Sequence, residues 1–185
     1  ELHAGSSVDD EVRLARARIG GDFDCTRLDL SGLGEAAVAP RRALTADAIQ
    51  VGGDVRLADG FRAIGEVRFR AARIEGDLRA SGNFTGSRLR DGGRGSALLL
   101  DRVVVGGSVR FDGGFFGAAG GVSLRQARIA GDLDATGASF DRLGDASLNG
   151  DAVLVLDRAR IDGSLILCEL QTPLLGASLV RARVG

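Results

Sequence analysis

The sequence predicts an all-β protein that folds as a single parallel β-helix, or β-solenoid, wound right-handed. About six to seven coils are expected, alternating between short and long. One sequence motif recurs along nearly the whole chain: it reads RARIGGDFDC near the start, and AARIEGDLRA and QARIAGDLDA later. Apolar and polar residues alternate around each copy, which is the pattern of short strands with one buried face. A repeat of this length indicates stacked structural units.

The copies can be aligned on the Ile or Val that precedes the glycine motif. These seven anchors are Ile19, Val51, Ile74, Val105, Ile129, Ile161 and Val184. Counted from the anchor, positions −7, −5, −2 and 0 are apolar in every copy, and so are +4 and +6 in the complete copies. The change of phase between −5 and −2 predicts a bend, so each copy should form roughly three short strands around one interior. Copies would pair in parallel about 4.8 Å apart, and parallel crossovers are almost always right-handed.

Glycine stands at +2 in all six complete copies, and Asp or Ser follows at +3. We expect a corner at +2, where a positive φ is easy only for glycine. The +3 side chains have two interpretations: they accept backbone N–H groups or pair with the arginines at −1, or Asp54 and Asp77 form a calcium site. Calcium takes six to eight oxygen ligands. The row offers isolated carboxylates beside arginines, which favours the structural interpretation.

The anchors are separated alternately by long steps of 31 or 32 residues and short steps of 23 or 24. The extra residues of the long coils follow the +6 strand, in SGLGEAAVAPRR, TGSRLRDGGRGSA and DRLGDASLNGDA. We expect them to form a row of loops at one corner of every second coil. The predicted organisation is a polar N-terminal cap or tail over residues 1–11 and one solenoid domain over residues 12–185.

Position −4 carries charges of alternating sign. It reads Asp47, Arg70, Asp101, Arg125 and Asp157 from the second coil to the sixth. Stacked coils would place opposite charges next to each other, whereas like charges would repel. We interpret this row as a structural charge ladder that favours the correct register.

The stretch GGFFGAAGG holds the one candidate recognition patch, formed by Phe115 and Phe116. The alternative is that at least one of these rings fills the core, in the row of Phe84 and Phe140. No catalytic, cofactor-binding or metal-binding residues are predicted, because His3 has no partner at a suitable spacing.

The two cysteines belong to coils far apart in the predicted stack. Cys25 lies in the first coil and Cys168 in the sixth. Their separation would be about 24 Å, from five coil spacings, which is far beyond the reach of a disulfide. Both are expected to pack as small apolar groups.

Composition excludes several classes of function. The 24 basic residues against 25 acidic ones leave a net charge of −1, which argues against a nucleic-acid partner, since that needs a basic excess. No apolar run approaches the roughly 18 residues of a membrane span, so no membrane insertion is expected. Without a leader the expected location is cytoplasmic. It would be extracellular if the chain is a processed or excised part of a longer one, as the missing initiator Met suggests.

The phrase A-R-I-x-G-D-L, at residues 72–78 and 127–133, resembles the repeat of large actinobacterial β-helical proteins of uncharacterised role. Some of those carry the label membrane-associated oxidoreductase. The resemblance implies a β-helix over nearly the whole chain. The phrase holds neither a strand–helix dinucleotide fingerprint nor a redox CxxC pair. More distantly, the pattern is similar to bactofilins, which polymerise end to end, and to pentapeptide-repeat proteins, which share the stacking logic.

These observations predict a non-catalytic structural or protein-interaction solenoid without a cofactor. It would bind a protein partner or self-associate through the solenoid end. The chain stops within a coil at SLVRARVG, so either the natural protein continues or this end stacks on a second molecule. The alternative is a polysaccharide-active β-helix enzyme or a carbohydrate-binding module. Such an enzyme needs convergent carboxylates, and this chain has no Trp or Tyr to stack on sugars.

Overall fold

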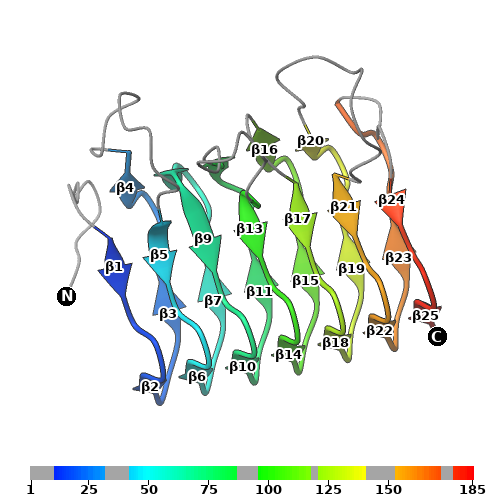
Figure 1. The fold of residues 1–185 in the computed structure, drawn as a ribbon, viewed down its shortest axis with the longest axis horizontal. Coiled ribbons are helices and arrows are strands. Elements are labelled where there is room, and N and C mark those ends of the chain that lie inside the picture. The colour runs from blue at the N-terminus through cyan, green and yellow to red at the C-terminus, as the bar shows by residue number, and fades with distance from the viewer. Residues whose placement is uncertain (1–10, 32–41, 87–95, 118–120, 141–152, 172–176) are drawn as a thin grey trace, which may run out of the picture.

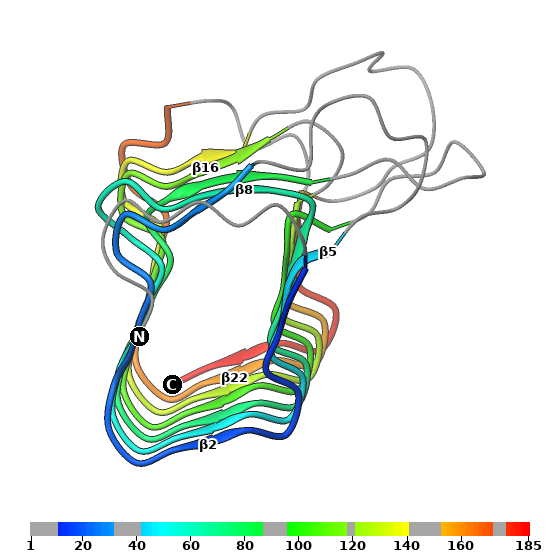
Figure 2. The ribbon, with the colours of Figure 1, turned by 90° about the vertical axis from the view of Figure 1, so that its left-hand side faces the viewer.

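The computed structural model of the chain shows one stack of coils (Figure 1). It describes residues 11–31, 42–86, 96–117, 121–140, 153–171 and 177–185. These residues contain strands, turns and bends and no helix. Seen from the N-terminal end, the chain runs clockwise as it recedes from the viewer (Figure 2), so the β-helix is right-handed. The predicted fold class is therefore confirmed.

Each full coil has four sides, whereas the sequence predicted about three strands per copy. The first sheet holds the strands before the bend: β1 (Val12–Arg13), β5 (Arg42–Thr45), β9 (Glu66–Arg68), β13 (Leu98–Leu99), β17 (Val122–Ser123), β21 (Leu154–Val155) and β24 (Ala177–Ser178). The second sheet holds the anchors: β2 (Arg18–Ile19), β6 (Gln50–Val51), β10 (Arg73–Ile74), β14 (Val104–Val105), β18 (Arg128–Ile129), β22 (Arg160–Ile161) and β25 (Arg183–Val184). The third sheet holds the strands after the glycine: β3 (Phe23–Asp24), β7 (Val55–Arg56), β11 (Leu78–Arg79), β15 (Val109–Arg110), β19 (Leu133–Asp134) and β23 (Leu165–Ile166). The fourth sheet closes the coil: β4 (Asp29–Leu30), β8 (Arg62–Ile64), β12 (Asn83–Thr85), β16 (Phe115–Gly117) and β20 (Ser139–Phe140).

Strand register follows the alignment of the repeat. Ile19 pairs with Val51, Val51 with Ile74, and the series ends with Ile161 opposite Val184. Long and short coils therefore stack in the same register, with one irregularity between Arg42 and Leu44, where β5 pairs with β9. The reason is that the long insertions all lie between the fourth sheet and the first, after β4, β12 and β20. The predicted loops themselves fall almost wholly outside the described residues, as does the predicted N-terminal cap, except for residue 11.

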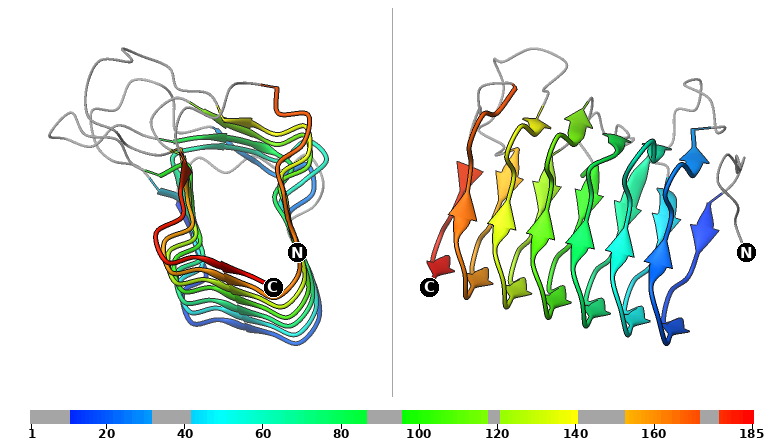
Figure 3. Two further views of the ribbon diagram at one scale, coloured as in Figure 1. Left: turned by 90° about the vertical axis from the view of Figure 1, so that its right-hand side faces the viewer. Right: turned by 180° about the vertical axis from the view of Figure 1, so that it is seen from behind.

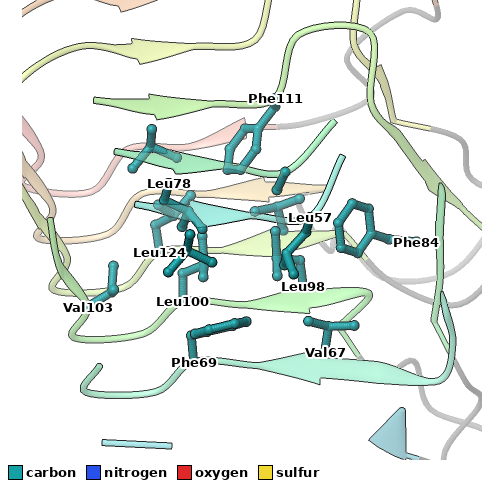
Figure 4. Close-up of a cluster of buried hydrophobic side chains, with 14 of the residues drawn as sticks. Leu57, Val67, Phe69, Leu78, Phe84, Leu98, Leu100, Val103, Phe111 and Leu124 are labelled. Carbon is teal, nitrogen blue, oxygen red and sulfur yellow. The ribbon is translucent and has the colours of Figure 1, made fainter. Parts of the chain in front are cut away.

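The interior of the stack is apolar throughout. Leu57, Leu78, Leu98 and Leu100 point into it from different coils and sides (Figure 4), and each is fully buried. The inward positions of the repeat supply these side chains, because alternate residues of a strand face the same side. The hydrophobic burial of this continuous core is what holds the coils together.

The fourth side contributes a row of stacked aromatic rings. The ring centroids of Phe84 and Phe116 are 5.0 Å apart, and those of Phe116 and Phe140 are 5.4 Å apart, with nearly parallel planes. Offset stacking of this kind adds to the energy of burial. One ring of the Phe115–Phe116 pair thus belongs to the core.

The bend between −5 and −2 is a tight turn, as predicted. The N–H of Ala72 donates to the carbonyl of Phe69 across it, and the other coils repeat this bond. The residue at −3 has a positive φ of 54° to 62° although it is never glycine: Arg16, Ala48, Ala71, Arg102, Gln126, Arg158 and Arg181. The glycines at +2 do not have a positive φ, so the prediction that this conformation explains them is wrong.

Candidate functional site

The Asp and Ser side chains at +3 bind the backbone of the following coil. Asp22 Oδ1 accepts the N–H of Asp54 at 2.9 Å, and Asp54 Oδ1 accepts the N–H of Asp77, also at 2.9 Å. Asp77 Oδ1 in turn accepts the N–H of Ser108 at 2.8 Å, and the series continues to the sixth coil. The interpretation in which this row accepts backbone N–H groups is confirmed. The hydrogen bond from Asp54 and the Arg56 guanidinium hold the pKa of Asp22 below its usual value.

This row also explains the glycine at +2. A Cβ added at Gly53 would overlap Oδ1 of Asp22, and one added at Gly76 would overlap Oδ1 of Asp54. The glycine therefore leaves room for the carboxylate of the preceding coil to reach its amide. The cause is close approach between coils, not the φ angle.

The carboxylates of this row already have partners. Asp54 forms an ion pair with Arg56 at 2.8 Å, and Asp77 forms one with Arg110 at 3.2 Å. These arginines stand at +5 on the third sheet, so the predicted pairing with arginines at −1 is wrong. In the part of the chain that the structure describes, no group of three or more His, Cys, Asp or Glu side chains is arranged to hold a metal ion. Nothing there favours the calcium interpretation of Asp54 and Asp77.

The charge ladder at −4 also acts on the backbone of the next coil. Asp47 Oδ1 accepts the N–H of Arg70 at 3.1 Å, and its Oδ2 pairs with Arg68 at 2.6 Å. Asp101 Oδ1 likewise accepts the N–H of Arg125 at 3.0 Å. The aspartates therefore contact the arginine of the next coil through its amide.

One guanidinium of this ladder reaches a ladder carboxylate among the described residues. Arg125 Nε lies 3.9 Å from Asp157 Oδ2. Asp157 also accepts hydrogen bonds from the Ser178 hydroxyl and the Val180 N–H. That the alternation of charge sets the register stays a prediction.

The predicted recognition patch is divided between the inside and the outside of the coil. Phe116 is 1% exposed and belongs to the core. Phe115 is half-buried and stands on the outer row of the fourth sheet, between Asn83 and Ser139. Its ring covers Gly117, where a Cβ would overlap it. Only Phe115 is accessible to a ligand, and its role in binding stays a prediction.

The two cysteines differ in exposure. Cys25 is buried, and burial raises the pKa of its thiol to about 12, so it is an inert apolar group as expected. Cys168 is exposed, which contradicts the expectation that it packs in the interior. His3 lies outside the described residues.

One feature of the surface was missed from the sequence: a basic groove on the second sheet, on the lower side of Figure 1. We call it the arginine groove. It is lined by Val104, Gln126, Ala127, Ala159 and six arginines: Arg102, Arg128, Arg158, Arg160, Arg181 and Arg183. The sequence did contain an indication of this groove, because Arg stands just before the anchor in three successive copies. The nearly balanced total of 24 basic and 25 acidic residues gave no indication that basic residues gather on one face.

The fold and the contacts between coils define this protein as a right-handed parallel β-solenoid whose polar side chains tie each coil to the next. The sequence matches no model of a known protein family and no curated protein. Among the described residues there is no helix with the length and hydrophobicity needed to cross a membrane.

Proposed function

We propose that this chain is a non-catalytic solenoid that serves as a structural or interaction scaffold and associates end to end. The observation that supports the proposal most directly is the outer face of the last described coil. Strands β24 and β25 pair with one neighbour each among the described residues. Leu179 is 43% exposed and Val184 is 47% exposed on this coil, which faces the viewer in Figure 3, left. Open strand edges beside apolar side chains favour pairing with a further coil, supplied by a second molecule or by a longer natural chain.

The use of the carboxylates supports the non-catalytic part of the proposal. A glycoside hydrolase needs two carboxylates that flank the scissile bond and are available to it. The aspartates at +3 and −4 instead accept N–H groups of the following coil, as Asp54 does from Asp77. Carboxylates used in this way join coils together and are not available for proton transfer.

The first described coil offers a matching surface. In a stack that continues the register, Leu179 of one copy would lie over Leu14 of the next, and Val184 would lie over Ile19. Leu14 and Ile19 are only partly buried in the single chain. Such a contact would extend the apolar rows of the first and second sheets from one molecule into the next.

The same stack would also bring positive charges together. Arg181 would meet Arg16, and Arg183 would meet Arg18, both at one coil spacing. Like charges at this distance repel, and salt screens the repulsion. End-to-end association should therefore strengthen as salt concentration rises.

Sedimentation velocity over a range of protein and salt concentrations tests the proposal. We expect a concentration-dependent series of oligomers that grows with salt. Val184→Glu should shift it to the monomer, because it places a charge on the apolar row of the end coil. Ala130→Glu introduces the same residue on an exposed position in the middle of the stack and should leave the oligomers unchanged.

Two outcomes would overturn the proposal. A chain that stays monomeric at every concentration and salt level would remove end-to-end association. Cleavage of any substrate in a panel of polysaccharides would remove the non-catalytic role and favour the alternative of a polysaccharide-active enzyme.

A further inference from the structure

Three arginines stack directly on one another in the arginine groove. Arg128 is the strand partner of Arg160, and Arg160 is the partner of Arg183, on β18, β22 and β25. Coils are about 4.8 Å apart, and like charges directly opposite each other destabilise a sheet. Arg160 pairs with Asp162 at 2.7 Å. Arg128 and Arg183 have no carboxylate within 4.0 Å among the described residues.

A second arginine stack in the same molecule shows how the fold normally compensates such charges. Arg56, Arg79 and Arg110 are strand partners at +5 on the third sheet. Arg56 pairs with both Asp22 and Asp54, at 2.9 and 2.8 Å. The other two pair with Asp112 and Asp77, at 2.9 and 3.2 Å. The third sheet thus neutralises its stacked arginines. The second sheet leaves Arg128 and Arg183 without an acidic partner among the residues described.

A second line of cations runs beside the first. Arg102, Arg158 and Arg181 occupy position −3 at the turn, where each has a positive φ near 60°. The backbones of Arg102 and Arg158 are fixed there by hydrogen bonds to the following coil: the Arg102 N–H donates to the Arg125 carbonyl at 2.8 Å, and the Arg158 N–H donates to the Val180 carbonyl at 2.9 Å. Like the unpaired members of the first line, they have no carboxylate within 4.0 Å among the described residues. The two lines of arginines therefore form a positively charged surface that exists before any ligand binds.

We propose that the arginine groove is a binding site for an extended anionic polysaccharide that carries sulfate or phosphate groups. The guanidinium group is a planar fork that binds the oxygens of such groups in pairs. The regular spacing of the coils suits a ligand with charges in series, rather than one compact anion.

The lining of the groove favours a sugar backbone over a nucleic acid. Sites for single-stranded nucleic acid combine basic side chains with aromatic rings on which bases stack. None of the described residues that line the groove is aromatic, and those between its arginines are Val104, Gln126, Ala127 and Ala159. The amide of Gln126 can both donate and accept hydrogen bonds, which suits sugar hydroxyls.

Binding of fluorescently labelled dextran sulfate, followed by anisotropy at low salt, tests this site. Unsulfated dextran has the same backbone without the anions. The chain should bind dextran sulfate, release it as salt is raised and leave dextran unbound. The double variant Arg128→Gln/Arg183→Gln should weaken binding about tenfold or more. Both side chains are exposed, so the fold should be kept.

The matched control is Arg79→Gln/Arg110→Gln, which removes the same charge from a pair of stacked arginines on the third sheet. It should change the affinity by less than about twofold, because these arginines already have acidic partners. An equal loss of affinity in both double variants would mean that the whole molecule, and not the groove, attracts the anion, and would overturn the proposed site. Failure of the chain to bind dextran sulfate would also overturn it. Equal or tighter binding of single-stranded DNA would overturn the assignment to a polysaccharide.

Discussion

Single polar side chains connect each coil to the next, and glycine at +2 makes this possible. Asp54 Oδ1 reaches the N–H of Asp77 by passing over Gly76. The hydrogen bond satisfies an amide at the corner between the second and third sheets. A larger residue at +2 would displace the carboxylate and leave that amide without its partner.

Gly76→Ala should therefore lower the free energy of unfolding by about 2 kcal/mol, the cost of losing a partly buried hydrogen bond and of local strain. Gly21→Ala is the matched control, because a Cβ there meets nothing within 4 Å. It should change stability by less than about 0.5 kcal/mol. Urea denaturation of both variants measures the difference, and equal effects would contradict the explanation by close approach.

Glu66 should make a contribution to the free energy of unfolding that decreases as pH rises. Burial raises its pKa above the ordinary value of 4.5, despite the nearby guanidinium groups of Arg68 and Arg42. The folded state therefore holds the proton more tightly than the unfolded state. This term is fully present below pH 4.5 and is lost as pH rises through the raised pKa of the folded state.

Glu66→Gln removes this titration. The variant should melt at a higher temperature than the parent at pH 7 and at nearly the same temperature at pH 4. Thermal melts followed by circular dichroism across this range test the prediction. A difference between variant and parent that does not change with pH would show that the charge of Glu66 is not the cause.

At the scale of single elements, three short strands of the fourth sheet, β12, β16 and β20, each turn an aromatic ring into the core. β16 places Phe116 between Phe84 and Phe140, while Phe115 on the same strand faces outward and is half-buried. Strand alternation thus separates two adjacent phenylalanines into one core residue and one surface residue.

Phe116→Ala should lower the free energy of unfolding by about 3–5 kcal/mol, because it opens a cavity between two stacked rings. Phe115→Ala should cost less than about 1 kcal/mol. Denaturation curves for the two variants would distinguish them, and similar losses would mean that the inward and outward assignments on β16 are incorrect.

At the scale of the whole molecule, stability comes from contacts between neighbouring coils. The fifth coil therefore matters to the coils on both sides of it. Leu133 is fully buried there, with Val109 as its strand partner in the preceding coil and Leu165 in the following one.

Leu133→Asp should be severely destabilising, by several kcal/mol, because it buries an unpaired carboxylate in the continuous apolar interior. Ala130→Asp places the same residue on an exposed position of the same coil and should have little effect. The melting temperatures of the two variants test the division of the coil into an inner and an outer face. Asp141→Ala, in a predicted loop, lies outside the described residues.

The sequence alone was sufficient to determine the solenoid, its coil boundaries and its strand register. The physical reason is that burial repeats with the coil: the same inward positions are apolar in every copy, and only one stacking register brings them together. The anchors Ile19, Val51 and Ile74 are accordingly strand partners. The fourth side was only partly visible, because its strands lie beyond the aligned positions, between +6 and the stretch whose length varies from coil to coil.

Only the tertiary structure showed how the outward side chains are used. A strand pattern separates inside from outside, but it does not say which charged groups of different coils come within reach of each other. The arginines at +5 on the third sheet lie beside aspartates, whereas Arg128 and Arg183 on the second sheet have no such neighbour in the part of the chain that the structure describes. The same repeat therefore produces a neutralised face and a basic groove. The difference depends on distances between coils and around corners, which the order of residues along the chain does not contain.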